Sequence, residues 1–245
     1  MNQQQHSRTV ALIGETALDK LAHARVAVFG IGGVGGHLAE ALARAGIGAL
    51  DLIDSDEVSV SNINRQIIAL HSTVGRPKVE VMAERIRDIN PDCVVRTHKC
   101  LYLPENADDF DLSVYDYIAD AIDTVSAKLE LAVRAKAAGV PIIAAMGAGN
   151  KLDPAAFEVA DISKTTVCPL ARVMRLELRK RGINHLKVVY SRELPVLSRG
   201  LPRQDSTVGP SGEDAHRRAT PASISFVPGA AGLLMAGEII KDMIG

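Results

Sequence analysis

The sequence predicts an α/β protein with a Rossmann-like, mostly parallel sheet, helices on both faces, and a smaller mixed extension of the sheet at the C-terminal end. Three observations support this class. Short apolar runs alternate with amphipathic helical segments, the first run ends in a glycine-rich turn that opens a helix, and the hydrophobic content of 47% is enough to bury a full core. Strands that alternate with helices form right-handed crossovers, which place them parallel in one sheet.

The first 147 residues carry the most regular pattern. Short apolar runs predict strands at residues 25–29, 49–53, 93–97, 115–119 and 140–145. Apolar residues at helical spacing predict helices at residues 33–46, 78–90 and 126–138. Pro91 prevents continuation of the second helix, and Gly139 ends the third.

The alternation loosens after Gly147. Strands are expected at residues 157–161, 186–190 and 223–227, and helices at residues 170–181 and 230–243. Residues 197–222 are rich in Gly, Pro, Ser and Arg and contain no face that could pack, so they are expected to form a long mobile loop. We therefore divide the chain into a Rossmann-like domain, residues 1–147, and a C-terminal region, residues 148–245, that continues the same fold.

Charge is unevenly distributed along the chain. The formal net charge is only −1, but residues 172–218 contain 11 Lys and Arg against 5 Asp and Glu. This excess favours an anionic partner for the C-terminal half. A solvated helix face followed by a polar loop would give the same count.

The cysteines and the chain ends indicate a cytoplasmic protein without a membrane partner. Cys93, Cys100 and Cys168 form no CxxC pair and have no metal-ligand spacing. An odd number of cysteines and a polar N-terminal segment predict a reducing compartment. The most apolar late stretch, residues 223–240, is interrupted by Pro228, which favours a buried closing helix over a membrane anchor.

A glycine-rich turn, GIGGVG, follows the first strand and matches the pattern G-x-G-x-x-G. Gly30 permits the tight turn, Gly32 lets a phosphate approach the backbone, and Gly35 lets helix and strand pack closely. Free N–H groups and the positive dipole at the helix start attract anionic oxygens. Asp54, at the end of the second strand, is placed to accept from a ribose hydroxyl. The motif indicates a nucleotide without separating NAD, FAD and ATP, and a turn that serves packing alone is the alternative.

Two cations favour ATP over a dinucleotide. Arg65 and Lys78 stand in the segments SNINRQ and GRPK, from which both could converge on phosphates. Attack of a carboxylate on an α-phosphate builds negative charge that fixed cations stabilise, whereas a dehydrogenase has no need of them. Asp123 is expected at the carboxyl edge of the sheet, where it could hold Mg²⁺ on the phosphates. On composition alone, both cations could also be ordinary surface charges.

These motifs resemble the ubiquitin-activating-type superfamily, which includes the molybdopterin-synthase and thiamine-biosynthesis adenylyltransferases. The resemblance is carried by GIGGVG, D-x-D-x-V-x-x-S-N-x-x-R-Q, G-x-P-K and D-A-I-D. It implies that residues 1–147 form an ATP-binding adenylation domain and residues 148–245 a substrate and dimer region. The nucleotide-binding residues that it implies are Gly30, Gly32, Gly33, Gly35, Asp54, Asp56 and Gln66. The catalytic residues that it implies are Asn62, Arg65, Lys78, Arg8 and Asp123, the last as a magnesium ligand.

Arg8 has a particular place in this resemblance. The segment RTVALIGE is similar to the stretch in which a superfamily arginine reaches the ATP of the partner subunit. The resemblance therefore implies a homodimer.

The C-terminal half resembles the tRNA threonylcarbamoyladenosine dehydratase family. The matching stretches are GAG with DP, DISKT, PLA, VVYSRE and SFVP, between residues 147 and 228. Members of this family adenylate the threonyl carboxylate beside the tRNA anticodon, and ring closure then expels AMP, which is a net ATP-dependent dehydration. The resemblance implies ATP, Mg²⁺ and a monovalent cation, Na⁺ or K⁺, as cofactors and tRNA as partner. Some relatives also work with a cysteine desulfurase or sulfur-acceptor system.

The predicted basic helix supplies candidate tRNA contacts. Its charged residues are Arg172, Arg175, Arg179 and Lys180. Several of them cannot share one helix face, so not all can touch RNA.

Two other functions stay open at this point. An adenylyltransferase for the C-terminal glycine of a ubiquitin-like sulfur carrier would use the same ATP chemistry, but that branch usually has two CxxC pairs, which this sequence lacks. A redox or NAD-sensing binding module could use the same glycine turn. Cys168 could act as a nucleophile at a helix start, although a small buried residue is the favoured interpretation.

Overall fold

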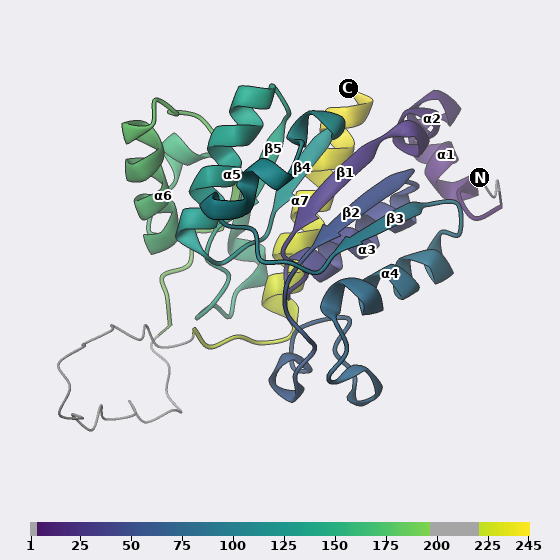
Figure 1. Cartoon of the computed structure of the whole chain (residues 1–245), viewed down its shortest axis with the longest axis horizontal. Helices are drawn as coiled ribbons and strands as arrows, with labels where there is room; N and C mark the ends of the chain where they lie inside the picture. Colours follow the sequence, from purple (N-terminus) through teal and green to yellow (C-terminus); the bar gives the residue numbers. More distant parts are fainter. Residues whose placement is uncertain (1–3, 197–220) are drawn as a thin grey trace.

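The computed structural model describes residues 4–196 and 221–245 and has one seven-stranded sheet at its centre (Figure 1). The strand order is β3-β2-β1-β4-β5-β7-β6. Their bounds are β1 Arg25–Phe29, β2 Ala49–Ile53, β3 Val94–His98, β4 Tyr117–Asp120, β5 Ile142–Ala145, β6 Phe157–Asp161 and β7 Lys187–Ser191. Strands β1 to β5 and β7 pair in parallel, and only β6 pairs antiparallel, with β7. The predicted α/β class with a mixed extension of the sheet is confirmed.

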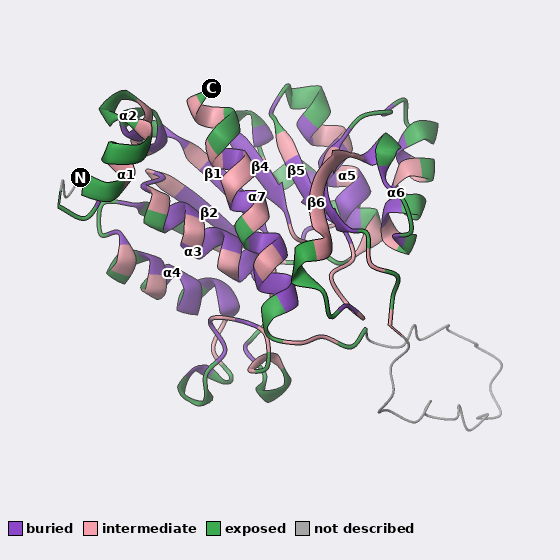
Figure 2. Ribbon diagram, turned by 180° about the vertical axis from the view of Figure 1, so that it is seen from behind, coloured by how far each residue is buried: buried purple, intermediate pink, exposed green. Residues whose placement is uncertain are grey.

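Helices cover both faces of the sheet. The helices are α1 Ser7–Ile13, α2 Glu15–His23, α3 Gly35–Ala45, α4 Lys78–Ile89, α5 Val125–Ala138, α6 Pro169–Lys180 and α7 Phe226–Ile244. Helices α3, α4 and α7 bury their apolar sides against one face, as the view in Figure 2 shows, and share a core with β1 and β2. Helices α5 and α6 lie on the other face, where α5 also packs on the short 3₁₀ turns Pro104–Asp109 and Leu112–Val114.

Side-chain alternation along β2 explains this two-sided core. Leu50 and Leu52 point to the core beneath α3 and α4, whereas Asp51 and Ile53 point to the opposite face. Asp51 is fully buried and accepts two hydrogen bonds from Arg25, at 3.0 and 2.6 Å. Burial by itself would raise the pKa of the Asp51 carboxyl, but the bonds from Arg25, His98 and Tyr115 hold it below its ordinary value.

The sequence misassigned one element and missed two. Residues 223–227, predicted as a strand, are instead an extended approach and the first turn of α7, which begins at Phe226. The alternation Ser-Ile-Ser-Phe-Val resembles a strand, but Pro228 sits in the first helical turn, where its missing N–H removes no hydrogen bond. Helices α1 and α2 were not predicted.

The C-terminal region is closely joined to the rest of the fold. Strand β7 pairs directly with β5, and α7 packs along α3. The division at residue 147 stays a prediction. Most of the predicted mobile loop, residues 197–220, lies outside the described residues. Among the helices in the described ranges, none has the length and apolar character needed to cross a membrane.

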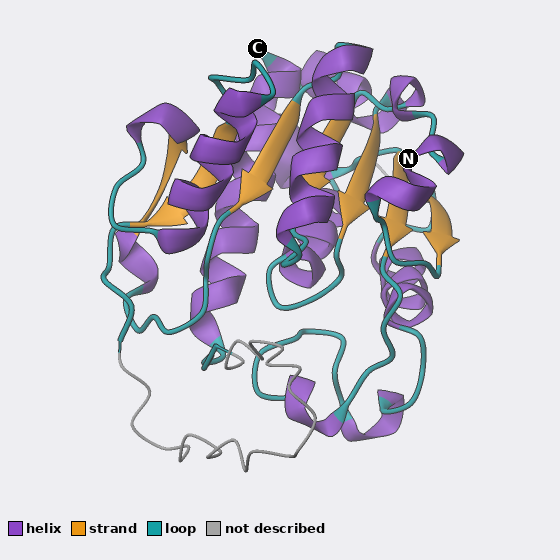
Figure 3. Ribbon diagram, turned by 60° about the vertical axis from the view of Figure 1, so that its left-hand side comes forward, coloured by secondary structure: helices purple, strands orange, loops and turns teal. Residues whose placement is uncertain are grey.

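All the parallel strands end at the same side of the molecule. The arrowheads in Figure 3 point toward this side, and the loops after β1, β2, β4 and β5 emerge there. Ligands of open α/β sheets bind at this carboxyl edge.

Candidate active site

The turn between β1 and α3 has the geometry that its glycines predict. Gly30 has φ of +90°, and a Cβ atom there would lie 2.7 Å from the Ala121 carbonyl oxygen. A Cβ atom on Gly35 would lie 1.8 Å from the Gly30 carbonyl oxygen, so only glycine lets α3 begin this close to the strand. The backbone beside Gly32 is open: among the described residues, only Gln66 Nε2 lies within 4 Å of an added Cβ atom. The turn therefore leaves room for a ligand at its middle glycine.

Asp54 follows β2 and closes the other side of this turn. Its Oδ2 accepts from the Ile31 N–H at 2.6 Å, and its Oδ1 accepts from the Asp56 N–H at 2.8 Å. Burial raises the pKa of this carboxyl, while the positive charge of Lys78 and the two backbone bonds oppose that shift. The carboxylate is thus fixed in place and retains lone pairs for a hydroxyl donor.

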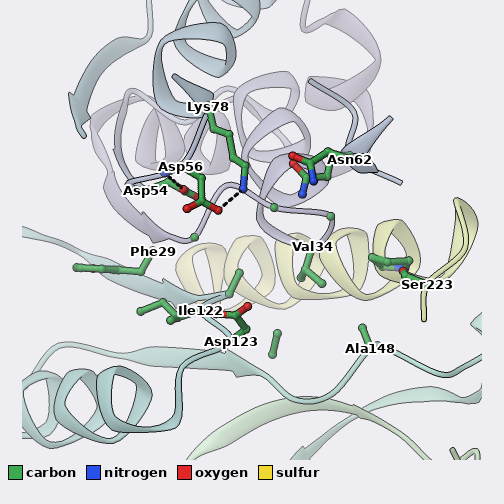
Figure 4. Close-up of a pocket in the computed structure, with 18 of the residues that line it drawn as sticks. Phe29, Val34, Asp54, Asp56, Asn62, Lys78, Ile122, Asp123, Ala148 and Ser223 are labelled. Carbon is green, nitrogen blue, oxygen red and sulfur yellow. Dashed lines mark hydrogen bonds and ion pairs between the residues drawn. The ribbon is translucent and has the colours of Figure 1, made fainter. Parts of the chain in front are cut away.

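Lys78, the first residue of α4, is held against Asp56. Its Nζ lies 2.7 Å from Asp56 Oδ2 (Figure 4), and its side chain is 6% exposed whereas that of Asp56 is 64% exposed. An isolated bridge between Glu57 and Pro77 brings the two segments together. The lysine is therefore enclosed, while its partner remains accessible to solvent.

Arg65 belongs to the irregular segment after β2. Its Nη1 donates to the Ser61 carbonyl oxygen at 2.9 Å and to Asn64 Oδ1 at 2.8 Å. In the same segment, Asn62 Oδ1 accepts from the Ser59 N–H at 3.1 Å and stabilises a short 3₁₀ turn. These local bonds hold Asn62 and Arg65 at the edge of the space in front of the glycine turn.

One cavity of about 540 Å³ collects most of the residues that the sequence singles out. Its wall includes Gly30, Gly32, Gly33, Asp54, Asp56, Asn62, Arg65, Gln66, Lys78 and Asp123. Figure 4 shows Asp54, Asp56 and Lys78 on one side of it and Ala148 and Ser223 on another. A nucleotide fits within this volume.

Two buried polar atoms of the cavity wall point to a polar ligand. Gln66 Oε1 and the Tyr102 hydroxyl are both buried, and neither has a hydrogen-bond partner in the described part of the chain. Burying such atoms without partners is unfavourable. Their position in the wall is consistent with a ligand that supplies the missing bonds.

Asp123 lies just after β4, in a turn fixed by a buried ion pair. Asp120, the last residue of β4, lies 2.9 Å from Lys128 Nζ, and both side chains are fully buried. Burial raises the pKa of Asp120, against the opposing charge of Lys128. Asp120 Oδ1 also accepts from the Ile122 N–H at 3.1 Å. The exposed carboxylate of Asp123 thus projects into the cavity from a rigid turn.

Five of the expected site residues lie away from the cavity wall, as does Gly35, which packs behind the turn. Arg8 is exposed on α1. Arg175 is bonded to the turn that precedes α6: its Nη1 donates to Thr165 Oγ1 at 2.7 Å and to the Thr165 carbonyl oxygen at 2.9 Å. Lys180 pairs with Glu177 at 2.6 Å. Arg172 and Arg179 are exposed on α6.

The sequence also left part of the cavity unassigned. Cys100, Leu101 and Tyr102 line it after β3, and their only signal was that they follow a predicted strand on the ligand side of the sheet. Cys168 is buried next to Gly147, which is consistent with the favoured structural interpretation.

Comparison with known proteins bears on this geometry. The model of the ThiF family matches residues 6–245. The tRNA threonylcarbamoyladenosine dehydratase of Bacillus subtilis is 44% identical over 243 residues, which cover 98% of this chain and 94% of the relative. The enzyme of the same name from Escherichia coli is 42% identical over 213 residues, covering 84% of this chain and 78% of the relative.

A solved structure extends the similarity to three dimensions. The crystal structure of Escherichia coli tRNA N6-threonylcarbamoyladenosine dehydratase in complex with ATP matches with a TM-score of 0.85 at 37% identity, and covers 99% of this chain and 94% of that one. The chain therefore belongs to the ThiF family and, within it, to the tRNA threonylcarbamoyladenosine dehydratases.

Proposed function

We propose that this protein is an ATP-dependent dehydratase that cyclises threonylcarbamoyladenosine next to the tRNA anticodon. The observation that carries the proposal is the meeting of the glycine turn, Arg65, Lys78 and Asp123 on one cavity. Support also comes from the two relatives named as dehydratases, whose matches cover 98% and 84% of this chain.

The reaction needs two steps at the carboxylate of the substrate. A carboxylate oxygen first attacks the α-phosphorus of ATP, so that an acyl adenylate forms and pyrophosphate leaves. The oxygen of the carbamoyl group then attacks the acyl carbon and the ring closes. A carbamoyl N–H releases its proton to solvent, and AMP leaves with the carboxylate oxygen. Negative charge builds on the phosphate oxygens in the first step, and fixed cations and helix N–H groups stabilise it.

Lys78 is suited to the first step because it is enclosed and already preorganised. Its present partner, Asp56, is largely solvated, so the ammonium group can transfer from that carboxylate to a phosphate without leaving a buried charge behind. Arg65, in the irregular segment after β2, adds a second positive charge at the cavity edge. Asp54 is the residue that we assign to the ribose hydroxyls.

The residues present fit a magnesium ion carried in on the phosphates. Mg²⁺ in such sites takes one or two carboxylates, and its other ligands are phosphate oxygens and water. Asp123 supplies one exposed carboxylate in the cavity, and the described residues contain no cluster of three or more His, Cys, Asp or Glu that could hold a metal by itself. When bound, the ion would neutralise phosphate charge. A monovalent cation, Na⁺ or K⁺, also belongs to the proposal, without assigned ligands.

We further propose a homodimer in which Arg8 acts on the partner subunit's ATP. Arg8 is exposed on α1 and does not line the cavity of its own chain.

The tRNA surface that we propose runs along α6. Leu170, in its first turn, lines the cavity, and Arg172 and Arg179 are exposed seven residues apart, which places them two turns apart on one helix face. The two arginines form a basic ridge that starts near the cavity, and they could bind successive phosphates of an RNA backbone. Arg175 and Lys180 are bonded within the protein and contribute less. A tRNA substrate implies a cytoplasmic location, where a sulfur-acceptor system could also assist.

The alternative function is activation of the C-terminal glycine of a ubiquitin-like sulfur carrier, and release of pyrophosphate from ATP separates the two. We expect release to be stimulated by tRNA that carries threonylcarbamoyladenosine. The same tRNA without the modification, and a carrier protein ending in Gly-Gly, should give no stimulation. Stimulation by the carrier alone would overturn the proposal.

A further inference from the structure

Asn150 occupies an unusual position in the loop after β5. Its φ is +56°, in the left-handed region that few residues other than Gly, Asn and Asp adopt. Its carbonyl oxygen accepts from the Val196 N–H at 2.8 Å, and its N–H donates to the Ala222 carbonyl oxygen at 2.7 Å. Its side-chain Oδ1 accepts from the Ala222 N–H at 2.8 Å. One residue thus binds two stretches that are distant in sequence.

The left-handed conformation is what makes these bonds possible together. The backbone reverses at Asn150, so that its carbonyl group faces Val196 while its N–H and side chain both face Ala222. The carboxamide oxygen accepts from the Ala222 N–H, and the backbone N–H of Asn150 donates to the Ala222 carbonyl oxygen, so both backbone polar groups of Ala222 are bonded to one residue. Glycine could adopt the backbone conformation but would lose the bond to Oδ1.

The stretch that Asn150 holds forms part of the cavity wall. Pro221 and Ser223, on either side of Ala222, both line the cavity, together with Gly147, Ala148 and Gly149. An added Cβ atom on Gly149 would lie 2.5 Å from Pro221 Cβ, so the two loops are in close contact.

The same stretch is also tied to the segment that carries Arg65. Asn64 Nδ2 donates to the Ser223 carbonyl oxygen at 3.0 Å, and Asn64 Oδ1 accepts from Arg65. Residues 221–223 are therefore bonded to two asparagines: Asn150, in the loop after β5, and Asn64, next to Arg65. This part of the wall lies away from Asp54, the residue assigned to the ribose (Figure 4).

We infer that Asn150 is a positioning residue for the RNA-borne substrate: its carboxamide holds Pro221–Ser223 as the wall against which the threonylcarbamoyl group is presented to ATP. The inference rests on the proposed function for the identity of that substrate. Asn150 itself does not line the cavity and acts through Ala222 and its neighbours. We expect ATP affinity to be unaffected, because Asn64 keeps its own bonds to Ser223 and Arg65 when the Asn150 carboxamide is lost, and Asp54 lies on the opposite side of the cavity.

The substitution Asn150→Gly tests this role because it removes one bond and keeps the backbone conformation. Asn150→Asp restores an oxygen acceptor on a residue that also tolerates positive φ. The loop stays anchored in both variants, since the Glu193 carboxylate still accepts from the Leu152 and Asp153 N–H groups at 3.0 Å. Asn184→Gly, at an exposed asparagine after α6, is the control for the general effect of introducing glycine.

Two measurements read the role. Hydrogen exchange of the Ala222 amide, followed by NMR, should become roughly three- to tenfold faster in Asn150→Gly, the range that one lost hydrogen bond gives. The value of kcat/KM for modified tRNA should fall by a similar factor, while the Kd for ATP without tRNA changes by less than twofold. Asn150→Asp should return both quantities to within twofold of wild type, and Asn184→Gly should alter neither.

The outcomes separate this inference from the proposed function. Weaker ATP binding in parallel with the loss in kcat/KM, faster exchange with unaltered kcat/KM, or no rescue by Asn150→Asp would each overturn the positioning role. A wild-type protein that fails to turn over modified tRNA would overturn the proposed function instead. In that case the exchange of the Ala222 amide still decides whether Asn150 anchors the wall.

Discussion

Lys78 illustrates how a single residue connects the fold with the chemistry. It is the first residue of α4 and directly follows Pro77, so the helix start fixes its direction. Its side chain is almost fully enclosed, yet the carboxylate that it meets is solvated. A cation in such a position costs little to redirect toward a phosphate, because its electrostatic surroundings are already organised.

Replacing either cation should slow the reaction and leave the fold intact. We expect Lys78→Ala and Arg65→Ala each to lower kcat by roughly 10²–10³, as the loss of one charge-stabilising donor does. Stability should change little, since Asp56 remains solvated without Lys78. The measurement is steady-state AMP release together with a thermal melt.

Lys241→Ala is the matched control for Lys78→Ala. Lys241 also forms an ion pair, with Glu238, but it lies near the end of α7 and not in the cavity wall. Its removal should leave turnover unchanged. Full turnover in both Lys78→Ala and Arg65→Ala would contradict their assigned roles.

Residues in fixed register with a strand end could be predicted at this scale, and residues in irregular loops could not. Gly30, Gly35 and Asp54 are set by the β1–α3 turn and the end of β2, so spacing predicted their positions in the backbone. Tyr102 lines the cavity from an irregular stretch after β3. The residues around it have no strand or helix periodicity from which the direction of its side chain could be predicted. Asn150 could not be predicted either, because its role depends on hydrogen-bond partners 46 and 72 residues away in the sequence.

At the scale of elements, α6 links the cavity to the exterior. Ala171, Met174 and Leu178 bury one side of it, which leaves Arg172 and Arg179 on the exposed side. Helical periodicity predicted this amphipathic helix, but not that Arg175 is bonded to Thr165. That bond depends on the turn before α6, which has no periodic pattern of its own.

Charge reversal on the exposed side of α6 should weaken tRNA binding. We expect the double variant Arg172→Glu/Arg179→Glu to reduce the salt dependence of tRNA affinity by roughly one unit of slope per lost phosphate contact. ATP affinity should stay the same. The measurement is a titration of labelled tRNA at several salt concentrations.

The control for this variant is Lys20→Glu/Arg87→Glu, which makes the same charge change on exposed positions of α2 and α4. A general electrostatic effect would weaken binding in both variants equally. Loss of ATP affinity in the α6 variant would show that the helix has a structural role and no direct one in RNA binding.

The two kinds of error in the predicted elements have separate physical causes. The segment 223–227 alternates like a strand, but packing of α7 against α3 overrides that local preference. Helices α1 and α2 are only 7 and 9 residues long and bury few side chains, so neither has the long apolar face that identified the other helices. Buried strands and long helices were predictable because burial on a sheet imposes a strict pattern.

At the scale of the whole molecule, the proposed dimer makes each site depend on two chains. A purified mixed dimer of one Arg8→Ala chain and one Lys78→Ala chain contains one site with both residues intact. We expect such a dimer to recover about half of the wild-type activity, whereas each parent dimer is impaired at both of its sites. The two chains can be given different affinity tags and purified in sequence. A mixed dimer no more active than its parents would place Arg8 in its own chain's site or outside catalysis.

The proposed reaction depends above all on attack of the substrate carboxylate on the α-phosphorus of ATP. The most direct measurement uses tRNA whose threonyl carboxylate carries ¹⁸O in both oxygens, with mass spectrometry of the released nucleotide. Attack at the α-phosphorus predicts that the product is AMP and that each AMP carries one ¹⁸O atom, because the carboxylate oxygen leaves with the phosphate on ring closure. Unlabelled AMP, or ADP with the label in inorganic phosphate, would contradict it.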